Sequence, residues 1–335
     1  MHVGYMAPSH LLDPGELADI AMLAEDLGFD SVFVTDQFQP WRGVGHAPAA
    51  VPWLAYVGAR TTRIALGANA LATSRRRTPS MVAQEFATLG CLLPGRVLLS
   101  LGTGHGHDDV AATGRRWPSA PSRQQRLQES LAIVRRLWEG ERVTFGGRFF
   151  RTQDASVHDL PEIPVPLLVT ALTPGEARLA GELADGMMTT SGTGVRQQAD
   201  VLVPTARTAA LGRASLDNIL EVKVSYDENP RRAAKSAKPW MPTGLLDTDT
   251  GTPVLDESMR GAIEGDLATE WLVASSPDQI MPLLREYATL GFGHLVFSSP
   301  GNNQERFLRA VAADLMPILR REDPGIADAD GTRAG

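Results

Sequence analysis

Two short segments of this 335-residue chain carry residues that could hold or transform a small molecule. Asp36 ends an apolar run, and a carboxylate in that position can bind a ligand, cap a helix or pair with an arginine. Gly102-Thr103-Gly104 follows another apolar run and lets the backbone approach a neighbour closely, although a simple turn explains it equally well. His105 comes next, and an imidazole can donate or accept a proton near neutral pH.

Two further segments could bind an anion. Thr173-Pro174-Gly175-Glu176 opens a predicted helix whose free N–H groups can hold a phosphate, and the same residues also fit a capping box. Arg75-Arg76-Arg77 is typical of a solvated face, and the alternative is contact with an anionic extension of a cofactor. His105 and His107 have no third ligand nearby, so we expect no metal site.

The elements that must position these residues alternate along the chain. Eight short apolar runs predict buried strands: Val3–Met6, Ser31–Asp36, Ile64–Leu71, Val97–Leu101, Pro166–Leu172, Gly186–Thr190, Ile219–Val224 and His294–Phe297. Amphipathic stretches between them predict helices: Glu16–Leu27, one from Thr78-Pro79 to a stop at Gly95, Gln124–Leu137, Pro174–Leu183, Val195–Leu211, Asp278–Tyr287 and Glu305–Leu319. Strands rich in Val, Ile and Leu with helices between them predict a closed α/β barrel, the (β/α)8 TIM barrel.

Residues 1–320 are expected to form this single barrel domain, with chemistry on the loops after the strands. Two insertions break the pattern: residues 141–158, with a hairpin turning at Gly146-Gly147, and residues 227–268, which we expect to cover the barrel mouth. Residues 321–335 are expected to be a disordered tail because they contain almost nothing apolar.

Composition excludes several classes of protein. The net charge of −7 argues against a nucleic-acid binder. Cys91 is the single cysteine, which excludes a disulfide scaffold, and it falls on the apolar face of a predicted helix, so we expect it in the core. The chain shows no signal-like start and no apolar run of the roughly 18 residues that a membrane span needs. We therefore expect a cytoplasmic protein without a membrane partner, and a homodimer is left open.

Taken together, the motifs resemble the F420-dependent glucose-6-phosphate dehydrogenases, a branch of the bacterial luciferase-like superfamily whose fold is a (β/α)8 barrel. The resemblance runs from about residue 3 to 320 and rests on these segments: Asp36-x-Phe38-Gln39-Pro40-Trp41-Arg42, Gly45-His46-Ala47-Pro48, Phe86–Cys91, Gly102-Thr103-Gly104, Thr190-Ser191-Gly192, Ser225-Tyr226-Asp227, Trp271-x-Val273-Ala274-Ser275 and His294–Phe297. It implies coenzyme F420, a deazaflavin that transfers hydride from carbon and reacts poorly with oxygen.

The resemblance also implies roles for single residues. Asp36 matches a carboxylate that contacts the cofactor, and Trp41 an aromatic residue in the substrate cavity. Asn69-Ala70 match a pair joined by a non-proline cis peptide behind the deazaflavin ring. Leu172-Thr173 match a glycine pair whose N–H groups hold the cofactor phosphate. The remaining positions assigned to cofactor or substrate are Ala72, Thr103, Asp108 and Thr190.

The departures from the family concern the substrate. Gln37 replaces a histidine that transfers a proton, and His105 replaces a glutamate. The basic residues that grip the sugar phosphate are absent: Thr193 stands at one position, Glu270 at another, and no lysine aligns with the third. A charge pair 4 Å apart is worth ~4 kcal/mol at an effective dielectric of ~20, so a carboxylate there disfavours glucose 6-phosphate.

These observations predict a reductase that uses F420H2 to transfer hydride to a C=N or activated C=C bond of a neutral or cationic specialised metabolite. Asp36 positions the ring, His105 is the candidate general acid, and Gln37 and Trp41 contact the substrate or the ring. The alternatives are an F420-dependent dehydrogenase of an unphosphorylated sugar or alcohol, a flavin monooxygenase with the same fold, and a non-catalytic deazaflavin-binding protein.

Overall fold

The computed structural model describes residues 1–40, 45–73, 76–191, 195–211, 216–238 and 271–321. Within them, eight parallel strands form a closed barrel: β1 (His2–Ala7), β2 (Ser31–Thr35), β3 (Ala65–Ala72), β4 (Val97–Gly102), β7 (Leu167–Thr170), β8 (Gly186–Thr190), β9 (Asp217–Tyr226) and β11 (His294–Ser298). The barrel closes through its last strands: β11 pairs with both β9 and β1, and β9 also pairs with β8. The predicted (β/α)8 barrel is therefore confirmed.

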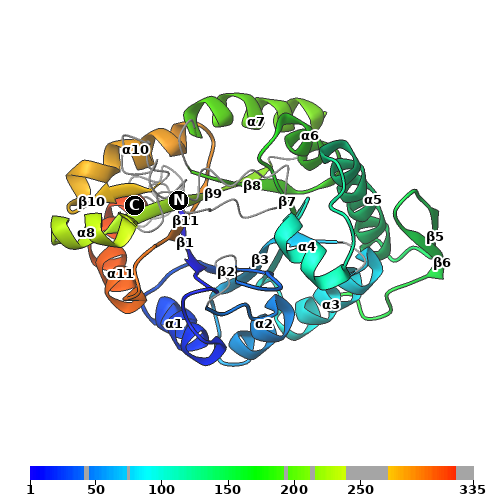
Figure 1. Cartoon of the computed structure of the whole chain (residues 1–335), viewed down its shortest axis with the longest axis horizontal. Helices are drawn as coiled ribbons and strands as arrows, with labels where there is room; N and C mark the ends of the chain where they lie inside the picture. Colours follow the sequence, from blue (N-terminus) through cyan, green and yellow to red (C-terminus); the bar gives the residue numbers. More distant parts are fainter. Residues whose placement is uncertain (41–44, 74–75, 192–194, 212–215, 239–270, 322–335) are drawn as a thin grey trace, which may run out of the picture.

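A ring of helices surrounds the strands (Figure 1). It is made of α1 (Pro14–Asp26), α2 (Ala50–Gly58), α3 (Pro79–Leu92), α5 (Ala120–Trp138), α6 (Pro174–Leu183), α7 (Val195–Ala209), α10 (Pro277–Thr289), and a last helix built from α11 (Gln304–Ala310), a π-helical turn (Val311–Leu315) and α12 (Met316–Arg321). Local signals fix several starts: Asp13, Thr78 and Thr173 cap α1, α3 and α6, each with proline in the first turn.

Four elements are absent from the sequence prediction: α2, α4 (Gly106–Thr113), α8 (Pro230–Ala237) and β10 (Leu272–Ala274). Both α4 and α8 are short and rich in polar residues, so they carry little apolar periodicity. The three residues of β10 pair with the end of β9. Cys91 is exposed rather than buried, because it lies in the last turn of α3, beside the exposed Leu92.

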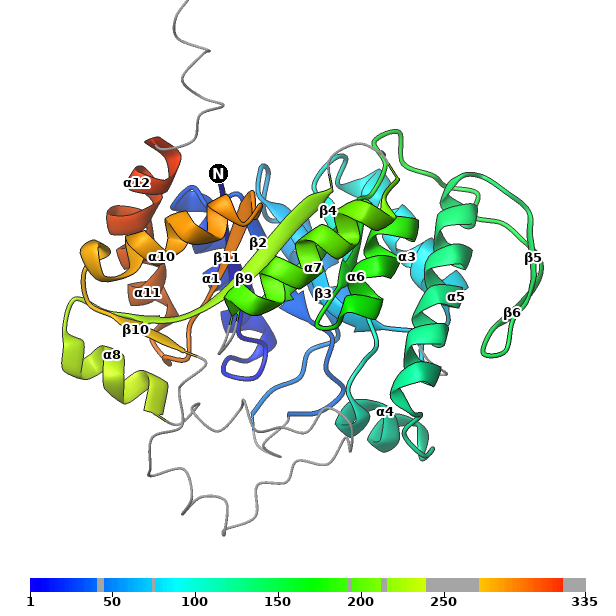
Figure 2. The same ribbon diagram turned by 90° about the horizontal axis from the view of Figure 1, so that it is seen from above.

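The insertion at 141–158 contains an antiparallel pair, β5 (Val143–Gly146) and β6 (Arg151–Ala155). It projects beside α5, outside the helix ring (Figure 2). The Glu129 carboxylate of α5 accepts hydrogen bonds from the backbone N–H groups of Arg148, Phe149 and Phe150 at 2.9–3.1 Å. One helix side chain thus fixes the hairpin tip. Most of the second predicted insertion (residues 239–268) and the predicted tail from residue 322 lie outside the described residues.

The barrel interior is filled in layers because every second strand residue points inward. An apolar plug closes the middle: Met6, Phe33, Leu168, Met188, Ile219 and Val296. Two residues further along the strands, the inward positions are polar, and we call them the polar ring: Thr35, Asn69, Ser100, Thr170, Thr190 and Glu221. The polar ring faces the C-terminal mouth, where barrel enzymes place their chemistry.

The opposite end of the barrel holds a half-buried histidine. His294 accepts or donates a hydrogen bond with the Ser31 hydroxyl, 2.8 Å away, and its ring lies 5.7 Å from that of His2. Burial, together with the neighbouring His2, lowers the pKa of His294 to about 4. His294 is therefore neutral at pH 7 and serves the packing of this end.

Candidate active site at the barrel mouth

Thr170 organises the polar ring. Its hydroxyl lies 3.0 Å from Asn69 Oδ1, 2.8 Å from the Ser100 hydroxyl and 3.1 Å from the Ala70 backbone N–H, which donates to it. Strands β3, β4 and β7 are thereby joined at the mouth by side-chain hydrogen bonds. The result is a polar floor above the apolar plug, with Asn69 and Ser100 buried.

Asn69 and Ala70 lie at this floor, but their peptide bond is trans, since the described chain contains no cis peptide. The cis bond implied by the family resemblance is therefore wrong for this structure. Strand β3 bends here by a different device: its register with β4 shifts between Ala68 and Leu71, and Ala70 adopts φ 55°. The bulge brings the Ala70 backbone close to Gly102 of β4, where an added Cβ would lie 3.3 Å from Ala70 Cα.

Asp36 is fully buried and is held by the protein itself. One carboxylate oxygen accepts the Ala50 N–H (3.0 Å) at the start of α2, and the other lies 2.9 Å from Arg76. Arg77 is 3.9 Å away and also bonds Glu85. Helix capping and arginine pairing, the structural alternatives for Asp36, are what the geometry shows. For Arg76 and Arg77 the expectation of a solvated face is wrong, because they pair with this carboxylate; Arg75 lies outside the described residues.

Gln37 stands next to Asp36 with an unsatisfied acceptor. Its Oε1 atom is buried and has no hydrogen-bond partner. The loop that carries it is fixed by Asp108 of α4, which accepts hydrogen bonds from the backbone N–H groups of Phe38 (2.9 Å) and Gln39 (3.3 Å). A buried orphan acceptor costs roughly 1–3 kcal/mol, and a ligand N–H would satisfy it.

The other predicted residues surround the same opening. His105 is exposed at the N-cap of α4, directly after β4. Ala72 ends β3 beside Gly104, where φ is +84° and an added Cβ would lie only 2.8 Å from Ala72 Cβ, so the position requires glycine. Thr190 is half-buried at the end of β8. Trp41, Thr193 and Glu270 lie outside the described residues.

Thr173 and Glu176 form the capping box of α6. Glu176 Oε2 accepts the N–H groups of Leu172 (2.9 Å) and Thr173 (3.0 Å), the two donors expected to hold a phosphate. Its other oxygen accepts from the Thr103 hydroxyl at 3.0 Å. The backbone donors are therefore already engaged by a carboxylate, and Thr103 is tied to it.

Glu221 and Lys223 are inward residues that sequence reasoning missed. Leu220 and Val222 pack into the outer core, so the alternate residues of β9 face the interior. Glu221 pairs in register with Thr190, and Lys223 with Ser298. The alternation of charged and apolar residues within this strand was the available signal.

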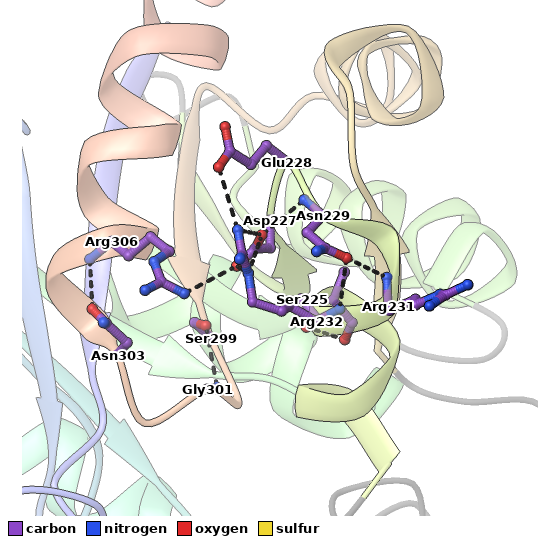
Figure 3. A network of polar contacts seen from close by, with 11 residues as sticks. Ser225, Asp227, Glu228, Asn229, Arg231, Arg232, Ser299, Gly301, Asn303 and Arg306 are labelled. Atoms are coloured by element: carbon purple, nitrogen blue, oxygen red, sulfur yellow. Dashed lines mark hydrogen bonds and ion pairs between the residues drawn. The ribbon is translucent and has the colours of Figure 1, made fainter.

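On the β9–β11 side the rim is held by ion pairs (Figure 3). Asp227, at the end of β9, lies 3.0 Å from Arg232 Nε of α8 and 3.7 Å from Arg306 of α11. The Ser225 hydroxyl donates to the Ala233 carbonyl at 2.7 Å. The Ser225-Tyr226-Asp227 motif therefore anchors α8 and α11 to the barrel.

Among the described residues no group of three His, Cys, Asp or Glu side chains could hold a metal ion. In the same part of the chain no helix is both long and apolar enough to cross a membrane.

The family model described as luciferase-like monooxygenase matches residues 1–294. An F420-dependent glucose-6-phosphate dehydrogenase of Nakamurella multipartita is 43% identical over 326 residues, 95% of this chain and 96% of the relative. Its counterpart from Kineococcus radiotolerans is 40% identical over 330 residues, covering 96% and 97%.

Among solved structures, an F420-dependent secondary alcohol dehydrogenase in complex with an F420-acetone adduct superposes with a TM-score of 0.84 at 24% identity, covering 95% of this chain and 99% of that one. The F420-dependent tetrahydromethanopterin reductase from Methanopyrus kandleri gives 0.71 at 20% identity, covering 95% and 100%. These two likenesses show the shared fold.

Proposed function

Because this chain belongs to the luciferase-like monooxygenase family, we propose that it is an F420-dependent oxidoreductase working as a reductase on a substrate other than glucose 6-phosphate. The F420 dependence follows from relatives that are 40–43% identical over almost the whole chain. The bond reduced is C=N, in an imine or iminium, or an activated C=C of a specialised metabolite.

The residues at the mouth fit the deazaflavin ring. The cofactor, when bound, supplies hydride from the carbon at ring position 5. Gln37 Oε1 is a buried acceptor without a partner, and it would accept a hydrogen bond from a ring N–H. The floor of Asn69, Ala70 and Thr170 offers a polar support, and Asp36 acts by fixing Arg76 and the start of α2.

The observation that carries the reductase direction is Gln37 itself. An amide has no proton to transfer at neutral pH, so Gln37 cannot act as the base that alcohol oxidation needs, and in the oxidative direction His105 would have to take that role. His105, exposed at the mouth, is the proposed general acid. On the substrate side, Thr190, Thr193 and Glu270 suit a neutral or cationic molecule rather than a phosphate.

The proposal is tested by anaerobic incubation in both directions. F420H2 is mixed with cyclic imines and enones, and oxidised F420 with glucose 6-phosphate and with unphosphorylated sugars and alcohols, while the cofactor's absorbance is followed. Reduction of an imine or enone supports the proposal. Turnover of glucose 6-phosphate overturns the proposal in favour of the activity in the relatives' names, and turnover of unphosphorylated sugars or alcohols alone supports a dehydrogenase of those substrates. Cofactor binding without any turnover supports a binding protein.

Two variants test the assigned roles. His105→Ala should slow reduction by ~10²-fold or more, whereas His158→Ala, on the exposed segment after β6, should not change the rate. Glu270→Arg should weaken the binding of a cationic substrate. Glu228→Arg, on the exposed rim, is the charge-matched control. Tighter binding of the cation to the Glu270 variant contradicts the electrostatic argument.

A further inference from the structure

A pocket outside the polar ring is lined by arginines. It measures about 160 Å³ and lies between α4, the start of α5 and the tip of the β5–β6 hairpin. Since one water occupies about 30 Å³ of liquid, it can take a group of several heavy atoms. The residues that give it its charge are Arg115, Arg116, Arg126, Arg148 and Asp109, a net charge of +3, and we call it the arginine pocket.

Only part of that charge is already paired. Arg126 bonds Asp109 at 3.1 Å and the Thr103 carbonyl at 3.1 Å. Arg115 and Arg116 are exposed, and their side chains form no ion pair with another described residue. The Arg148 guanidinium makes a 3.3 Å hydrogen bond to Gln125 and lies over the Phe149 ring at 5.4 Å, and neither partner is charged. The pocket therefore presents guanidinium groups without a counter-charge.

Trp117 adds a second signal. Its ring lines the pocket and lies under two guanidinium groups, those of Arg123 (5.0 Å) and Arg126 (5.8 Å). Its indole N–H is buried and has no acceptor. A buried donor without a partner beside uncompensated arginines is what an anionic oxygen would satisfy.

The arginine pocket is joined to the cofactor side of the mouth by one residue. Thr103 bonds Glu176 through its hydroxyl and Arg126 through its carbonyl. Glu176 in turn holds the Leu172 and Thr173 N–H groups, so Thr103 links the start of α6 to the wall of the arginine pocket. In Figure 2, α4 and the first turns of α5 lie together at the mouth end, with the hairpin alongside α5.

We propose that the arginine pocket binds carboxylates of the polyanionic tail of the deazaflavin cofactor. Coenzyme F420 carries glutamyl carboxylates beyond its phosphate, so it supplies the ligand chemistry that the pocket lacks. This inference rests on the proposed F420 dependence and adds a subsite for the tail. Arg115, Arg116 and Arg148 bind the carboxylates, and the Trp117 N–H donates to one of them.

The test compares equilibrium binding of oxidised F420 with that of its analogue lacking the glutamyl tail, followed by cofactor fluorescence. The wild type should bind the tailed form about tenfold more tightly. The double variant Arg115→Gln/Arg116→Gln should abolish this difference and leave the tailless form within twofold of wild type. Arg136→Gln/Arg142→Gln removes the same charge from exposed pairs outside the pocket and should keep the difference.

The outcomes separate the two proposals. Equal binding of both forms by the wild type overturns the tail subsite and leaves the F420 dependence standing. Binding of neither form overturns the F420 dependence itself. A double variant that keeps the tail preference also overturns the assignment, even if it binds the cofactor well. Trp117→Phe keeps an aromatic ring but removes the N–H, and it should weaken the binding of the tailed form alone.

Discussion

Replacing Asp36 by Asn should destabilise the fold by about 3 kcal/mol, because breaking a buried ion pair from one side leaves charge uncompensated. The Asp36 side chain is completely buried, and those of Arg76 and Arg77 are 20% and 14% exposed. Asparagine keeps an oxygen for the Ala50 N–H, so the substitution removes charge with little change of shape. With an unfolding entropy of about 2.1 cal/mol/K per residue, the melting temperature should fall by about 4 °C.

The matched control is Asp154→Asn. Asp154 also pairs with an arginine, Arg142, but the two side chains are 60% and 64% exposed, so we expect a much smaller loss of stability than for Asp36→Asn. Both variants are compared with the wild type by urea unfolding and by thermal melting. If Asp36→Asn costs no more than Asp154→Asn, the stabilising role of the buried pair is refuted. The substitution Arg76→Gln should lower the free energy of unfolding by less in the Asp36→Asn variant than in the wild type.

Three further predictions concern other parts of the chain. A histidine in the unfolded chain binds a proton below about pH 6.5, whereas His294 in the folded protein does so only below about pH 4. The free energy of unfolding of the wild type should therefore fall by about 2 kcal/mol between about pH 7.5 and pH 5. In urea unfolding over the same interval, His294→Gln should lose less. Gly104→Ala should lower the free energy of unfolding by about 1–3 kcal/mol and weaken cofactor binding. Gly146→Ala should do neither, because open space surrounds Gly146, and equal effects of the two variants contradict the steric argument. Glu129→Ala should speed proteolysis at residues 147–150 without exposing the barrel, and an unchanged cleavage rate contradicts the tip-fixing role.

The barrel could be predicted because its information is local. Each strand is an apolar run bounded by turn residues, and Pro174 beside Thr173 marks a helix start without any tertiary contact. Helix α4 escaped prediction because Gly106 to Thr113 is held by the loop after β2 rather than by an apolar stripe of its own. Tertiary contact outweighs propensity there.

The candidate site was only partly predictable for the same reason. Asp36 was correctly placed at a strand end, but its partners, Ala50 and Arg76, come from other loops and follow no fixed spacing. Glu221 and Lys223 were overlooked because the apolar residues that alternate with them in β9 dominate the pattern. Gln37 could be identified from the sequence because it differs from the family pattern. That its oxygen has no hydrogen-bond partner follows only from the three-dimensional structure.

The closure of the barrel has a consequence for how the protein is made. Strand β1 starts at His2 but completes its pairing only with β11, at His294, so almost the whole chain must be synthesised first. At translation rates of about 5–20 residues per second, the first strand waits roughly 15–60 s with one bare edge. Chains truncated before β11 would keep that edge, together with the unpaired edge of β9, and should aggregate through strand-to-strand pairing. Fragments released early are thus prone to aggregate, because the closed sheet forms only when the last two dozen barrel residues have been added.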